Sequence, residues 1–315
     1  MLRAVRTMDR AIAAVRQERR SSGAQVDPSI DPNGTGLIGP EVDELTTSLG
    51  RLDAKRTTTN PNFAALVVHL LHQAGVRAGD TVAIGASGSF PALLIASLAA
   101  AEAMDVHPAV IISLGASSFG ATHTGFDLLS LCQLLLSAGI FDTPPAAVSL
   151  GGEQDTGLGF EPEALQALTG QIRESGLPYI FESGLRANVA QRMECYDRAA
   201  SPRPIAAFIN IGGAYANMGA SPRALDLKPG LNMRISLPPE EERGVIFEMA
   251  ARGIPVIHLL FIKGLANRHG LPWDPVPLPR PGDWLPSDPH GGTGFWLVSI
   301  AYFGLLLWLL VRADS

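Results

Sequence analysis

The stretch VAIGASGSFPALLIASLAAAEAM, residues 82–104, joins a short apolar run, a loop of glycine and serine, and a long Ala/Leu segment that begins at Pro91. An apolar run without alternation predicts a strand that is buried on both faces, and proline is well tolerated in the first turn of a helix. The same order of strand, polar loop and helix recurs to about Leu260. The predicted strands are residues 81–84, 109–114, 146–150, 179–181, 206–211 and 256–260. We therefore expect an α/β domain with a doubly wound, mostly parallel sheet of about six strands.

The chain divides into four predicted parts. Residues 1–39 contain an amphipathic helix and a loop, and the many arginines of this helix suit either packing on the domain or a membrane surface. The α/β domain spans 40–270. Residues 271–294 are rich in proline, which disfavours a helix, and are predicted to form an extended linker. The fourth part is an apolar segment at 295–311.

This last segment reads FWLVSIAYFGLLLWLLV and contains no charged side chain. Its length is near the minimum for a helix that crosses a bilayer, and Trp296 and Trp308 lie near its two ends, as is typical at the lipid–water boundary. The segment predicts a C-terminal transmembrane helix, a single-pass anchor in the cell inner membrane. A helix buried in a core or in a dimer interface is the alternative. Arg312 alone gives no charge bias that would place the domain on one side of the membrane.

Composition and motifs exclude several classes of function. The net charge is -6 and no basic stripe is present, so nucleic acid is not an expected partner. No GxxxxGK[ST] motif follows a strand, and the first strand-to-helix turn lacks GxGxxG, so no ATP, NAD or other cofactor is predicted. His69 and His72 share a helix face without a carboxylate or cysteine at ligand spacing, and no metal site is expected. Cys132 and Cys195 lack paired spacing and are predicted to be structural thiols.

Polar residues follow the predicted strands. The carboxyl ends of parallel strands share one edge of a sheet, and ligands bind in the crevice there. The candidate ligand-binding residues at these ends are Ser87, Gly88, Ser89, Ser117, Ser118, Glu153, Glu182 and Asn210. Lys55, Arg56 and Arg186 are the nearest cations along the chain and could pair with substrate carboxylates, although a solvent-exposed role is the favoured interpretation of each one taken singly.

The loop from Gly85 to Pro91 is the most specific of these turns. Its glycines allow a ligand to approach the backbone, and Ser87 and Ser89 supply hydroxyl groups. The helix that begins at Pro91 directs free amides and a positive dipole end toward the loop, which favours an anion. The stretch 82–104 also resembles the phosphosugar-binding loop of sugar isomerase domains, which implies a phosphosugar-binding-like scaffold as one alternative.

A catalytic interpretation starts from Ser87. This serine lies on a strand-to-helix turn like that of a nucleophile elbow, but Ser89 replaces the second glycine of G-x-S-x-G. His123 is the candidate base, and Asp127 or Glu182 would orient its ring. This hypothesis predicts a serine-dependent hydrolase or transpeptidase that uses Ser87 or another loop nucleophile.

Five sequence blocks together resemble one family. They are LTTSLG at 45–50, AKRTTTNPNFAA at 54–65, GASGSFPAL at 85–93, LGASSFGA at 114–121 and FINIGGAYANMG at 208–219. The combination is similar to the poly-gamma-glutamate system protein family, over about residues 11–279. Relatives often carry an N-terminal membrane segment ahead of the helix that here begins near Met8, so either a late start or a single anchor is expected for this chain.

The resemblance implies an accessory protein of a membrane-bound system that makes and exports poly-γ-glutamate, a polymer of the cell envelope or capsule. The implied partners are an ATP-dependent poly-γ-glutamate ligase, small membrane subunits and the anionic polymer or glutamate itself, with lipid around the C-terminal helix. No catalytic residue follows from the resemblance. The expected function is binding of the polymer in the crevice, and the alternatives are hydrolysis or transpeptidation of γ-glutamyl amides or a purely structural scaffold for the ligase.

Overall fold

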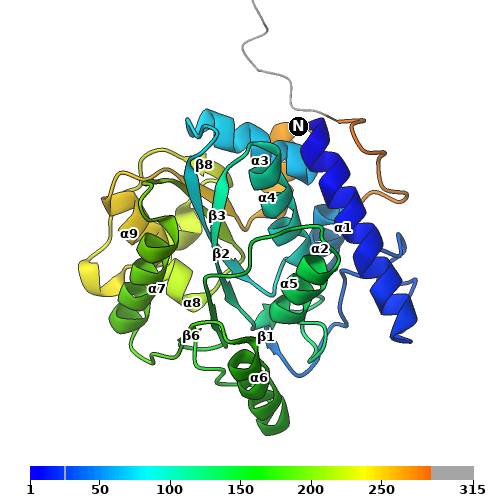
Figure 1. The fold of residues 1–315 in the computed structure, drawn as a ribbon, viewed down its shortest axis with the longest axis horizontal. Helices are drawn as coiled ribbons and strands as arrows, with labels where there is room; N and C mark the ends of the chain where they lie inside the picture. The colour runs from blue at the N-terminus through cyan, green and yellow to red at the C-terminus, as the bar shows by residue number, and fades with distance from the viewer. Residues whose placement is uncertain (25, 285–315) are drawn as a thin grey trace, which may run out of the picture. The chain divides into compact units, whose positions relative to one another are not determined.

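The computed structural model describes residues 1–24 and 26–284, and the part up to Trp284 forms one compact unit (Figure 1). The predicted anchor at 295–311 lies outside the described residues. Within the described residues, no helix combines the length and the apolar character that a membrane crossing requires.

A central sheet of seven strands has the order β6-β5-β3-β2-β7-β9-β8. The strands are β2 Thr81–Ser87, β3 His107–Ser113, β5 Ala147–Ser149, β6 Tyr179–Ile180, β7 Ile205–Ile211, β8 Gly230–Asn232 and β9 Val256–Leu259. Neighbours run parallel except β8, which is antiparallel to β9 at the sheet edge. The predicted parallel α/β architecture and its six strands are confirmed. The short β8 was not predicted, because Gly-Leu-Asn carries no β-branched signal.

Helices cover both faces of this sheet. They are α1 Leu2–Ser21, α2 Leu52–Thr58, α3 Phe63–Gln73, α4 Pro91–Ala103, α5 Leu128–Ser137, α6 Pro162–Ser175, α7 Leu185–Ala200, α8 Tyr215–Met218, α9 Val245–Ala251 and α10 Ile262–His269. Figure 1 shows α7 and α9 on one side of the central strands and α1, α3, α4 and α5 on the other. Side chains alternate along each strand, so each strand supplies both cores. In β2, for example, Ile84 packs in one core and Ala83 in the other.

Helix α4 is buried on all sides because α1 and α3 pack over it. The apolar stripe of α1, which includes Met8, Ile12 and Val15, is buried in the same core. The N-terminal amphipathic helix therefore packs on its own domain, one of the two expected arrangements.

The proline-rich segment is tied to the domain up to Trp284. Arg56 pairs with Asp274 at 2.5 Å, and Asn33 donates to the Pro275 carbonyl at 3.0 Å. The Asn62 amide oxygen accepts from the Gly282 amide at 2.9 Å. The part of the predicted linker that the structure describes therefore lies against the domain, because side chains of the domain satisfy backbone groups that an extended segment leaves unpaired.

A buried polar cluster joins α7 to the carboxyl ends of β3 and β5. Arg192 of α7 pairs with Asp155 at 2.7 Å, and neither side chain is exposed. Arg192 also donates to Ser149 at 2.6 Å and to Ser113 at 3.1 Å. Asn188 donates to the Asp155 carboxylate at 2.8 Å. This cluster fixes the loop that follows β5, because a buried charge must keep its partner.

Replacement of Asp155 by Ala should lower the free energy of unfolding by about 3–5 kcal/mol, because it strands the Arg192 guanidinium without a counter-charge. The matched control is Asp197→Ala, which removes an exposed ion pair with Arg252 and should cost less than about 1 kcal/mol. Urea unfolding of the two variants measures the difference. Equal losses in the free energy of unfolding would show that the buried Arg192 pair stabilises the fold no more than the exposed pair does.

Candidate anion-binding site

A cavity of about 310 Å³ lies at the carboxyl edge of the central sheet. Residues at or just after the ends of five strands line it, namely Ser87, Ser113, Gly151, Gly213 and Leu260. The cavity opens beside β2, which has β3 as its neighbour on one side and β7 on the other. This is the position at which doubly wound sheets bind ligands, because the connections on either side leave toward opposite faces.

Segments from outside the central sheet complete the walls. The small parallel pair of β1, Thr46–Ser48, and β4, Ala116–Ser117, contributes Thr47, Ser48 and Ser117. Helix α2 contributes Lys55, and Trp273 comes from the proline-rich segment. Three parts of the chain that are far apart in the sequence, at 46–58, 116–117 and 273, therefore meet over the strand ends.

The charged residues that line the cavity are all cationic. They are Arg51, Lys55 and Lys263, and the lining contributed by described residues includes no Asp or Glu. This contrasts with the net charge of -6 for the whole chain. Of the other predicted cations, Arg56 is paired with Asp274, and Arg186 lies at the surface and pairs with Glu240 at 2.6 Å. Arg51 pairs with Asp53 at 2.5 Å, whereas Lys55 and Lys263 form no salt bridge within the described residues. The cationic lining suits an anionic ligand.

Lys55 is the most unusual group in the cavity, because its side chain is only 2% exposed and forms no salt bridge within the described part of the chain. The ammonium group donates to the Ser89 carbonyl and lies 2.7 Å from the Ser117 hydroxyl. It also lies 4.2 Å from the centre of the Phe90 ring, a cation–π distance. Burial without a counter-charge lowers the pKa of Lys55 to about 7.

Three of the predicted serines, Ser87, Ser89 and Ser117, line the same cavity as this lysine. The Ser89 hydroxyl accepts from the Ser117 amide at 3.0 Å, and the Ser87 hydroxyl lies 3.5 Å from the Ile211 carbonyl. Gly212 faces Ser87, and a Cβ there would come within 2.2 Å of the Ser87 hydroxyl, besides lying at a φ of +79°. Only glycine therefore allows Ser87 to keep its place in the cavity wall.

The other predicted ligand-binding residues lie outside the cavity lining. Gly88 donates its amide to the Ser113 and Gly115 carbonyls, and Ser118 is buried near the Ser48 carbonyl. Asn210 lies inside the domain, where it donates to the Gly212 carbonyl at 2.8 Å. These three residues shape the loops. Glu153 and Glu182 are exposed, and neither is among the described residues that line the cavity.

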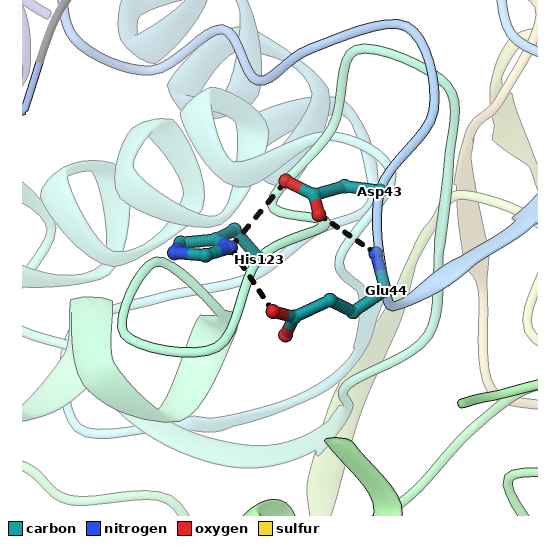
Figure 2. A group of neighbouring side chains, drawn as sticks. All are labelled: Asp43, Glu44 and His123. Carbon is teal, nitrogen blue, oxygen red and sulfur yellow. Dashed lines mark hydrogen bonds and ion pairs between the residues drawn. The ribbon is translucent and has the colours of Figure 1, made fainter. Parts of the chain in front are cut away.

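The predicted Ser87–His123–Asp127 constellation is not joined by hydrogen bonds in the described structure. The Nδ1 atom of His123 lies 3.4 Å from Asp43 and 3.6 Å from Glu44, and its side chain is half-exposed (Figure 2). The Asp127 carboxylate accepts from two amides at the start of α5, which makes it the N-cap of that helix. Sequence proximity had suggested a triad, but each side chain has a nearer partner.

Figure 2 also shows the one group of described side chains with spacing close to that of a metal site. One ligand atom each from Asp43, Glu44 and His123 lies within 4.8 Å of the other two. The second Glu44 oxygen accepts from the Thr124 hydroxyl at 2.6 Å. The His123 ring lies between the two carboxylates, and the three side chains with Thr124 form one polar cluster.

Arg51, Lys263 and Trp273 belong to the site but were not predicted from the sequence. Arg51 and Trp273 lie in segments that do not follow a predicted strand, whereas Lys263 comes shortly after the predicted strand 256–260. The clue that was available is the block LTTSLG at 45–50, which ends directly before Arg51.

The burial of Lys55 makes a prediction about stability and pH. The unfolded chain holds a proton on this lysine up to its ordinary pKa of 10.5, whereas the folded chain releases it near 7. Between these values the free energy of unfolding should rise with pH by up to about 1.4 kcal/mol per pH unit relative to Lys55→Met. Below about pH 7 both states are protonated and this contribution to the slope disappears. Urea unfolding of both proteins across this range tests it, and parallel pH profiles would show that Lys55 has an ordinary pKa.

Comparisons of the chain with protein-family models, with curated proteins and with solved structures find no match. The chemistry and geometry of the cavity, together with the sequence blocks, are therefore the basis on which a function is proposed.

Proposed function

We propose that this protein is a membrane-anchored accessory protein of poly-γ-glutamate synthesis or export, and that its cavity binds carboxylate groups of the glutamate polymer. The observation that carries the proposal is the charge of the cavity. Lys55, Arg51 and Lys263 line it, and no Asp or Glu is among its described lining residues. Arg51 pairs with Asp53 at 2.5 Å, whereas Lys55 is buried without a counter-charge. A bound carboxylate would supply the charge that Lys55 lacks.

The remaining walls suit the rest of a γ-linked glutamate unit. Each unit carries a free carboxylate, an amide and two methylene groups. The cavity offers apolar surface from Phe90, Leu260, Phe261 and Trp273 and hydroxyl groups from Ser87, Ser117 and Thr47. Its volume is at the lower end of the range for small-ligand sites, which suits a short stretch of polymer.

The proposed membrane anchor and the proposed partners are inferred from the sequence. The apolar run at 295–311 would act as the C-terminal transmembrane anchor, which would hold the cavity near the inner membrane. The resemblance of the blocks at 45–50, 54–65 and 208–219 supports a place beside the poly-γ-glutamate ligase and its small membrane subunits.

Titration calorimetry of the full chain in detergent with short γ-linked glutamate oligomers tests the binding proposal. We expect heat of binding that weakens as salt is raised, because charges make the contact. Lys55→Met should weaken binding by roughly tenfold to a hundredfold, since a hydrogen bond to a charged group contributes about 1.5–3 kcal/mol. The double variant Arg51→Ala, Lys263→Ala should also weaken it.

The matched control removes one arginine and one lysine from exposed positions away from the cavity, Arg203→Ala with Lys228→Ala, and should leave the affinity unchanged. A hexose phosphate titrated in parallel tests the phosphosugar-binding alternative. Tighter binding of the sugar phosphate, or equal affinity of the oligomer for all variants, would contradict the proposal.

A further inference from the structure

We propose that Ser117 and Lys55 form a nucleophile and base pair, through which the cavity cleaves or transfers the acyl group of amides that carry a free carboxylate. The substrate class in this inference rests on the proposed function, whereas the catalytic pair rests on geometry. The Lys55 Nζ atom lies 2.7 Å from the Ser117 Oγ atom, and both residues line the cavity. A serine hydroxyl this close to a lysine amine can pass its proton directly to the amine.

Several backbone contacts hold Ser117 in position. Its amide donates to the Ser89 hydroxyl at 3.0 Å, and its carbonyl accepts from the Gly120 amide at 3.0 Å. It pairs with Ser48 across the small parallel sheet. A nucleophile needs this kind of support, because its side chain must stay aligned with the substrate.

Lys55 has the environment of a base. It is buried, its remaining contacts are the Ser89 carbonyl and the Phe90 ring, and no carboxylate of the described chain stabilises its charged form. Its pKa of about 7 means that a large fraction of the amine is neutral at physiological pH. A neutral amine keeps the lone pair that accepts the serine proton.

Gly50 lies directly against the pair. A Cβ at this position would lie 3.1 Å from the Ser117 hydroxyl, 3.2 Å from Cε of Lys55 and 2.6 Å from the Ser118 carbonyl. The absence of a side chain at Gly50 therefore leaves room for the contact between the amine and the hydroxyl.

The other four serines of the cavity lining lack a base. The Ser87 hydroxyl donates to the Ile211 carbonyl at 3.5 Å, and the Ser89 hydroxyl accepts from a backbone amide. The Ser113 hydroxyl contacts Ser149 and the Arg192 guanidinium. None of these hydroxyls, nor that of Ser48, has an amine or imidazole partner in the described structure. The geometry therefore selects Ser117.

The reaction balances without a cofactor. Neutral Lys55 takes the Ser117 proton while the Ser117 oxygen bonds to the amide carbon, which gives a tetrahedral intermediate. The carbon–nitrogen bond then breaks, and the Lys55 ammonium returns the proton to the departing amine. Water, or the amine of another chain, attacks the acyl-serine and gives its proton to Lys55, which passes it to the Ser117 oxygen as the ester bond breaks.

The cationic residues then have separate roles. Lys55 can pair with a carboxylate only as the charged ammonium, as in the binding proposed above, and can accept the serine proton only as the neutral amine. Lys263 is exposed and lines the same cavity, and Arg51 lines it while paired with Asp53 at 2.5 Å. During catalysis Lys263 is therefore placed to hold the substrate carboxylate and leave Lys55 to transfer the proton.

Labelling of the full chain with an alkyl fluorophosphonate, followed by peptide mass spectrometry, tests the pair. We expect a covalent adduct on Ser117 whose rate of formation rises through about pH 7. Lys55→Met should slow it by at least about a hundredfold, the typical contribution of a general base. Ser117→Ala should abolish the adduct, whereas the matched control Ser137→Ala, at an exposed serine outside the cavity lining, should retain it.

A second measurement keeps the test independent of the folding of Ser117→Ala. In Ser117→Cys, the thiol should react with iodoacetamide faster than the same cysteine combined with Lys55→Met, because the ammonium stabilises the thiolate. The native Cys132 and Cys195 are both buried and free, so the new thiol is the more accessible one. Equal rates in the two backgrounds would overturn the pairing.

The outcomes separate this inference from the proposed function. Oligomer binding without an adduct on Ser117 would overturn the catalytic pair and leave polymer binding intact. Formation of a Lys55-dependent adduct without binding of the oligomer would support the catalytic pair. It would contradict the inference that the substrates carry a free carboxylate. Full activity of Ser117→Ala on γ-glutamyl amides would also overturn the assignment of Ser117 as the nucleophile.

Discussion

The burial of Lys55 without a counter-charge is the constraint that organises the site. Removal of an ammonium group from water is unfavourable, and the structure compensates for only part of it through the Ser89 carbonyl, the Ser117 hydroxyl and the Phe90 ring. Either an anion enters the cavity and stabilises the charge, or the proton leaves and produces a neutral amine. Ligand binding and catalysis are two consequences of the same desolvation.

The Arg192 cluster shows the opposite solution to the same problem. Arg192 is as deeply buried as Lys55, but Asp155, Ser149 and Ser113 surround its guanidinium. Its charge is balanced inside the domain, so it stabilises the loop after β5. Ser113 belongs both to this cluster and to the cavity lining, and it connects the rigid interior to the site.

The cavity is also an assembly of distant segments. The strand ends supply its floor, whereas Lys55, Ser117 and Trp273 come from α2, β4 and the proline-rich segment. The pair of Arg56 with Asp274 holds this segment beside α2. Because the lysine and the serine of the proposed pair lie on different elements, their distance depends on the packing of α2 against the β1–β4 pair and on the absence of a side chain at Gly50.

Local sequence patterns determined the architecture. The apolar strands, the turn from Gly85 to Pro91 and the Ala/Leu helices were sufficient to predict a parallel sheet with polar residues at one edge, because periodicity and turn chemistry act over a few residues. Tertiary structure alone decided which polar side chains meet. It turned Glu153 and Glu182 outward, gave His123 and Asp127 other partners, and brought Lys55 to Ser117, which lies 62 positions further along the chain. Such contacts depend on how helices and strands pack and on which polar groups are desolvated. Neither property can be read from the spacing of residues along the chain.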